Sequence, residues 1–158
     1  MREQDPRVPA DVEQYLIELF ARAGQLGGSI GGGVGAGGAG ALGGGRGGAK
    51  GGARGAMRLR TVVEDRGTVA PLTRDEALQK LTSAFPKLIP LPTADAAVRV
   101  AIPLGLTGLQ QVVVDILVPA SSDGQQLPLV RTYCKEGLLS RKPAARIADQ
   151  VANALQNQ

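Results

Sequence analysis

A four-residue repeat runs from Leu26 to Arg58 and constrains the fold of this chain more than any other feature. The period lies close to the 3.6 residues of an α-helical turn, so in a helix the repeated side chains would form one slowly drifting stripe. Until Met57 the residues between the repeated positions are only Gly, Ala and Ser. The repeated positions are Leu26, Ile30, Val34, Gly38, Leu42, Arg46, Lys50, Arg54 and Arg58. The apolar ones, Leu26, Ile30, Val34 and Leu42, form a candidate helix-packing stripe.

The sequence leaves three interpretations of residues 24–57 open. Glycine costs up to about 1 kcal/mol per residue in a helix, which favours a flexible tether. Alternatively, small residues at every fourth position would let helices approach closely as a glycine zipper, and the uncharged run 23–45 would reach about 34 Å as a helix, enough to cross a membrane. The basic flank would then lie on anionic lipid. A third interpretation is an RGG-like arm that binds nucleic-acid phosphates.

The excess positive charge lies around this tract. Residues 24–60 hold five basic residues and no acidic one, whereas residues 1–23 carry a net charge of -2 and residues 61–158 a net charge of +1. Such a local cationic run attracts phosphate groups. The candidate anion or phosphate contacts are Arg46, Lys50, Arg54, Arg58 and Arg60. A second basic group, Arg131, Lys135, Arg141, Lys142 and Arg146, is diluted by acidic neighbours and is interpreted as a solvated face, with a phosphate-binding patch as the alternative.

The residue types argue against an enzyme. The chain has no histidine, which removes the commonest general base and metal ligand, and it shows no catalytic, metal or cofactor motif. Cys134 stands beside Lys135, whose charge would activate a thiol, but a lone cysteine at a strand end is better explained as a small buried hydrophobe. Acidic residues after Met1 do not resemble a signal peptide, so we expect a cytoplasmic location, with membrane association as the alternative.

Hydrophobic spacing predicts an amphipathic helix over 12–23, ended by Gly24, and a second helix over Arg74 to Ala84 that begins with a capping box at Thr73 and Glu76. Strands are predicted over 58–64, 97–102, 110–118 and 126–134, and a last helix starts near Pro143. Val112, Val114, Ile116 and Val118 share one strand face, which we expect to be the core.

This order predicts an α+β fold, in which two helices cover one face of a four-stranded, mainly antiparallel sheet (β-α-β-β-β-α). The other face is then left to solvent or a partner. The predicted domains are an N-terminal amphipathic helix (1–23), a Gly-rich tether or glycine zipper (24–57) and a small α+β domain (58–158).

The strand-to-helix junction at Lys135, Glu136, Gly137 and Leu138, followed by an alanine-rich helix, resembles a recurrent ending of small uncharacterised bacterial domains with this order of strands and helices. The resemblance covers residues 58–155 and implies the fold, not an activity.

These observations predict a non-enzymatic binding or structural protein, in which the α+β domain binds a protein partner or self-associates. The alternatives are a membrane-associated glycine-zipper protein with a basic flank on anionic lipid, and a nucleic-acid-binding arm.

Overall fold

The computed structural model describes residues 5–68, 71–93, 98–105, 108–117, 127–136 and 142–156, without the side chains of residues 28–43. The chain divides into two compact units, Met1–Thr61 and Val62–Gln158.

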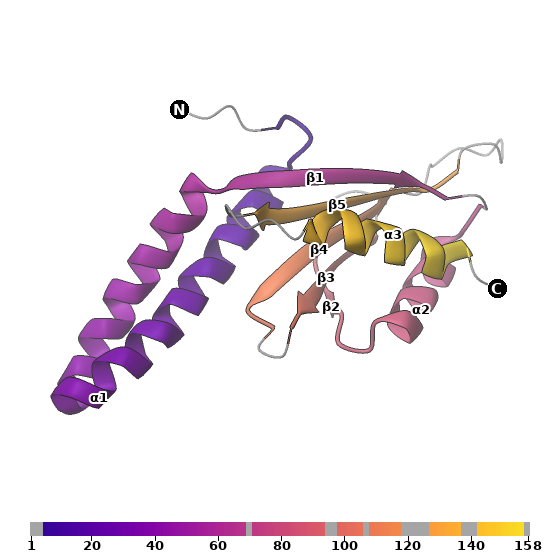
Figure 1. Cartoon of the computed structure of the whole chain (residues 1–158). Helices are drawn as coiled ribbons and strands as arrows, with labels where there is room; N and C mark the ends of the chain where they lie inside the picture. Colours follow the sequence, from indigo (N-terminus) through magenta and orange to yellow (C-terminus); the bar gives the residue numbers. More distant parts are fainter. Residues whose placement is uncertain are drawn as a thin grey trace. The chain divides into compact units, whose positions relative to one another are not determined.

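The first unit is built on one long helical segment, α1 (Ala10–Arg58). Asp11 and Glu13 lie in its first turn and Arg58 in its last, as the helix dipole favours. A straight helix would place residues 24 and 48 about 36 Å apart. In the structure, however, a Cβ added to Gly24 would overlap the carbonyl oxygen of Gly48. The segment therefore doubles back as a helical hairpin with a first arm (10–27) and a second arm (44–58) (Figure 1).

The hairpin differs from the prediction that the first helix ends at Gly24, and from the flexible-tether interpretation, one of the three left open for residues 24–57. Helical structure continues through the glycine-rich tract. Glycine removes the side chains that would keep the two arms apart, so their backbones come into direct contact at Gly24, Gly48 and Gly52. Tertiary packing of this kind can outweigh an unfavourable helix propensity.

The second unit is an α+β fold, as the sequence predicts. After β1 (Arg60–Gly67) come α2 (Arg74–Ala84), β2 (Ile89–Pro90), β3 (Val98–Leu104), β4 (Gln110–Leu117), β5 (Leu129–Glu136) and α3 (Pro143–Gln156). The strands form an antiparallel sheet in the order β1-β5-β4-β3-β2. The sheet has five strands instead of the predicted four, because residues 89–90 add a short edge strand. Pro90 is tolerated there, since an edge strand does not need every backbone donor.

Helices α2 and α3 cover one face of this sheet (Figure 1). Val112, Val114 and Ile116 on β4 lie in the core between the sheet and these helices, which confirms the predicted core face of this strand. Val118 lies outside the described residues. The other members of the core include Ala77, Leu81, Val98, Val100, Ile102, Val130, Cys134, Ala144, Ile147, Val151 and Leu155.

Four residues on the second face of the sheet are buried. Ala101, Val113, Asp115 and Tyr133 point away from α2 and α3, since they alternate with the core residues along their strands, yet all four are buried. That this face binds a partner stays a prediction.

Helix α2 begins and ends where the sequence predicts. The Thr73 hydroxyl accepts a hydrogen bond from the backbone N–H of Glu76, and the Glu76 carboxylate accepts one from the backbone N–H of Thr73. This capping box satisfies two donors that the first helical turn leaves without partners.

Candidate anion-binding surface

Four basic residues form a continuous row along the second arm of the hairpin. Arg46, Lys50, Arg54 and Arg58 are all exposed and follow one another at intervals of four residues. At a rise of 1.5 Å per residue, the row extends over about 18 Å. We call these four residues the cationic stripe.

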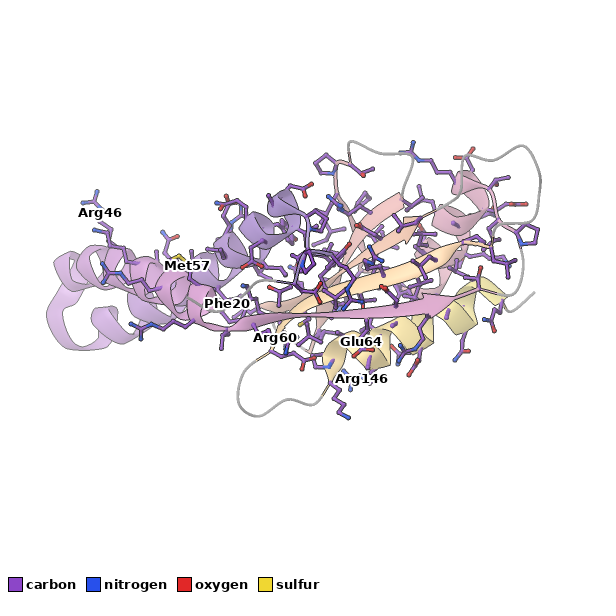
Figure 2. The ribbon with its side chains drawn as sticks, turned by 90° about the horizontal axis from the view of Figure 1, so that it is seen from above. Phe20, Arg46, Met57, Arg60, Glu64 and Arg146 are labelled. Atoms are coloured by element: carbon purple, nitrogen blue, oxygen red, sulfur yellow. The ribbon has the colours of Figure 1, made fainter. Side chains whose placement is uncertain are left out.

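The cationic stripe lies on the outer side of its arm. Residues two positions apart in a helix differ by about 200° around its axis, so Gly48 and Gly52 lie nearly opposite Lys50. Gly52 is in close contact with the backbone of Phe20, and a Cβ at position 52 would overlap that residue's carbonyl oxygen. The same arm therefore packs with one side and presents its charges on the other. Figure 2 shows the Arg46 side chain directed away from the ribbon.

The cationic stripe has no counter-charge in the described part of the chain. The ion pairs in this part of the chain join other basic residues, namely Arg7, Arg66, Arg99 and Arg131. No acidic residue occurs between residues 24 and 60. Four neighbouring cations without carboxylates between them produce a positive potential that an anionic partner can neutralise.

Bare glycine backbone lies beside the cations. Gly47, Gly51 and Gly55 each follow a basic residue, and a Cβ added to any of them would meet no atom within 4 Å. The helix is therefore narrow on this side, and a large anionic surface can approach the charges closely.

Arg60 does not belong to this row. It lies beyond the C-cap of α1, Leu59, and is the first residue of β1. Its charge also faces the N-terminal segment: the pKa of Asp5 is lowered to about 2, first by hydrogen bonds from Arg7 and in smaller part by the charge of Arg60. The five predicted anion contacts thus divide into four residues on one helix and one on a strand.

The candidate helix-packing stripe is described only at Leu26, whose side chain is 53% exposed. The side chains of Ile30, Val34 and Leu42 lie outside the described residues. In the described residues, the two arms contact each other through the backbone of glycine residues.

The second basic group does not form a common surface. Arg131 donates two hydrogen bonds to Asp65, and Lys135 is buried. Arg146 is exposed on α3, where Figure 2 shows it pointing outward, and Arg141 lies outside the described residues. The group contains both buried and exposed members, so we do not include it in the candidate site.

Sequence reasoning missed a row of alternating charges across the second face of the sheet. Asp65, Arg131, Asp115 and Arg99 follow one another on β1, β5, β4 and β3. Asp115 lies directly opposite both Arg131 and Arg99 in the strand register, and Arg131 is hydrogen-bonded to Asp65. Arg99, Asp115 and Arg131 are separated by equal intervals of 16 residues in the sequence. This spacing could have indicated the row, but only if the pairing of the strands had been known. The row satisfies its own charges and specifies the register, because a slip of one residue would place them on the core face.

Tyr133 joins this row through a hydrogen bond from its hydroxyl to Asp115 at 3.1 Å. Burial, followed by the negative charge of Asp115, raises the pKa of Tyr133 well above its usual value. The phenol is therefore a neutral donor at physiological pH and has a structural role.

Cys134 on β5 is buried in the hydrophobic core between the sheet and its two helices, as the sequence predicts. Burial, with the charge of Glu136 as a smaller cause, raises the pKa of its thiol to about 12. This is opposite to the shift that an activated nucleophile needs.

Among the described residues, no group of three or more His, Cys, Asp or Glu side chains is placed to hold a metal ion. No helix in these parts of the chain combines the length and apolar character that crossing a membrane requires.

Comparison with known proteins finds no matching family model, no matching curated protein and no matching solved structure.

Proposed function

We propose that this chain is a non-enzymatic binding protein whose helical hairpin holds a polyanion on the cationic stripe. The observation that carries the proposal is the position of Arg46, Lys50, Arg54 and Arg58 on one exposed side of an arm whose opposite side is packed. Because the helix holds the four charges in fixed positions, less conformational freedom is lost on binding than in a flexible basic tail.

The stripe supports a polymer better than a small anion. Charges distributed over about 18 Å suit a ligand that carries several negative groups in a row. A small anion needs converging donors in a concave site. The shallow hollow on α2, lined by Asp75, Leu78, Gln79, Thr82 and Ser83, contains no basic residue.

The proposal is tested with the full chain and inorganic polyphosphate as the probe, measured by isothermal titration calorimetry. In the stripe variant, Arg46, Lys50, Arg54 and Arg58 are all replaced by Gln. In the matched control, the exposed residues Arg22, Arg74, Lys87 and Arg146 are replaced by Gln. Both variants lose three Arg and one Lys, so each reduces the formal net charge from +4 to 0.

We expect the stripe variant to lose polyphosphate binding and the control to retain most of it. Equal losses in the two variants would mean that overall charge, not the stripe, attracts the polymer. Absence of binding by the unmodified chain at low salt would contradict the proposal outright. Far-UV circular dichroism checks that both variants keep their helix content.

A further inference from the structure

We infer that the polyanion is duplex nucleic acid, bound along its phosphate backbone and without sequence preference. This inference rests on the proposed function and specifies the partner of the same cationic stripe.

The residues beside the stripe favour a nucleic acid over a lipid surface. A helix that binds in a membrane interface needs a row of large apolar side chains next to its basic ones. Beside the stripe lie Gly47, Gly51 and Gly55. On the described parts of the two arms, the exposed large hydrophobic residues are Leu26 and Met57, one on each arm. They do not form a row that could be buried among acyl chains.

The aromatic residues favour a duplex over a single strand. Proteins that bind single strands without sequence preference stack the bases on aromatic side chains. The chain contains four aromatic residues, none of them between residues 24 and 60. Tyr133 is buried, and Tyr15, Phe20 and Phe85 are half-buried. The stripe therefore offers charge but no surface for stacking, which suits a partner whose bases are already stacked and whose phosphates face outward.

The chemistry of the stripe matches phosphate contacts. Three of its four residues are Arg, whose planar guanidinium group donates two parallel hydrogen bonds to a phosphate. Its length of about 18 Å corresponds to roughly half a turn of duplex. The exposed positions between the cations are mainly Gly, which has no side chain to read base edges. Contacts of this kind position a protein on the backbone but do not specify a sequence.

The salt dependence of binding gives a numerical test. With four phosphates neutralised, the logarithm of the association constant should fall against the logarithm of salt concentration with a slope of about -3.6 for a duplex and about -2.8 for a single strand. Between about 50 and 200 mM salt, a slope of -3.6 weakens duplex binding by roughly 150-fold.

The experiment measures fluorescence anisotropy of labelled DNA duplex, RNA duplex and oligothymidylate with the full chain, and co-sedimentation with phosphatidylserine vesicles. We expect binding to at least one duplex with the steep slope, and the two duplexes distinguish DNA from RNA as its source. The stripe variant should lose this binding, while the matched control keeps the slope.

Tighter binding to oligothymidylate than to both duplexes would overturn the inference. So would co-sedimentation with vesicles in the absence of duplex binding. Binding of polyphosphate without binding of either duplex would also reject it, yet leave the proposed function standing. Failure with every polyanion would reject both.

Discussion

Arg99 on β3 and Asp115 on β4 lie directly opposite each other and are joined by two hydrogen bonds, from Nε to Oδ1 at 2.6 Å and from Nη2 to Oδ2 at 2.8 Å. Both side chains are buried, with 8% and 3% of their side-chain surface exposed. A buried charge needs such a partner, because removal from water is costly.

Replacing one member of this pair should therefore destabilise the second unit strongly. For Arg99→Met we expect the free energy of unfolding to fall by roughly 3–5 kcal/mol, since the buried Asp115 carboxylate loses both hydrogen bonds from Arg99. The double variant Arg99→Met with Asp115→Leu should lose less than the two single variants together. Urea unfolding followed by circular dichroism measures all three. Strict additivity would show that the pair does not interact in the way its geometry indicates.

The close contact of the two α1 arms predicts opposite effects at neighbouring glycines. In Gly52→Ala the new methyl group overlaps the carbonyl oxygen of Phe20, so the arms must separate, and we expect a loss on the order of 1–3 kcal/mol. Gly51→Ala is the matched control, because its methyl group meets nothing, and it should stabilise the helix by about 0.5–1 kcal/mol.

Hydrogen exchange of the amides in residues 10–27 and 44–58 distinguishes these two variants. Exchange should accelerate in Gly52→Ala and slow in Gly51→Ala. If both substitutions had the same effect, the hairpin contact would not exist in solution.

The buried Cys134 thiol predicts a loss of stability at alkaline pH. Its pKa is raised in the folded chain from an ordinary value of 9.0 to about 12, so the folded state holds its proton more tightly than the unfolded state does. This contribution is fully present below about pH 9 and is lost as the pH rises through 12. Cys134→Ala should therefore lose less stability than the unmodified chain between pH 9 and 11. The native thiol should also resist Ellman's reagent at pH 8 and react once the chain is unfolded; rapid reaction of the native chain would disprove its burial.

The capping box of α2 predicts a smaller effect. Thr73→Ala removes the acceptor for the Glu76 backbone N–H and should cost about 1 kcal/mol of unfolding free energy. Thr82→Ala is a suitable control, because that hydroxyl donates to the carbonyl of Leu78 inside the helix and caps nothing. Its effect should stay within about 0.5 kcal/mol. Thermal unfolding of both variants makes the comparison, and equal effects would remove the cap as the cause.

The order of elements in the second unit could be predicted because its signals are local. The capping box fixed the start of α2 at Arg74, and the alternation of Val112, Val114 and Ile116 identified a strand and its core face. Each of these two signals depends on only a few adjacent residues. The short strand β2 was not predicted. A segment of only two residues, Ile89 and Pro90, shows no periodicity in the sequence, and it forms a strand only by pairing with β3.

The residues of the candidate site could be predicted from the sequence, but the helix that carries them could not. The four-residue spacing placed Arg46, Lys50, Arg54 and Arg58 on one side of any helix that formed. Whether a helix formed depended on a contact between Gly24 and Gly48, far apart in the sequence, that outweighs the intrinsic cost of glycine.

By itself, the sequence determined the α+β pattern, the location of the excess charge and the periodicity of the glycine tract, because these follow from composition and local spacing. The tertiary structure alone decided that the tract forms a hairpin, that Arg60 lies apart from the stripe, and that Asp65, Arg131, Asp115 and Arg99 meet across four strands. All three depend on which distant backbones approach one another, and that is determined by packing and strand pairing over the whole chain.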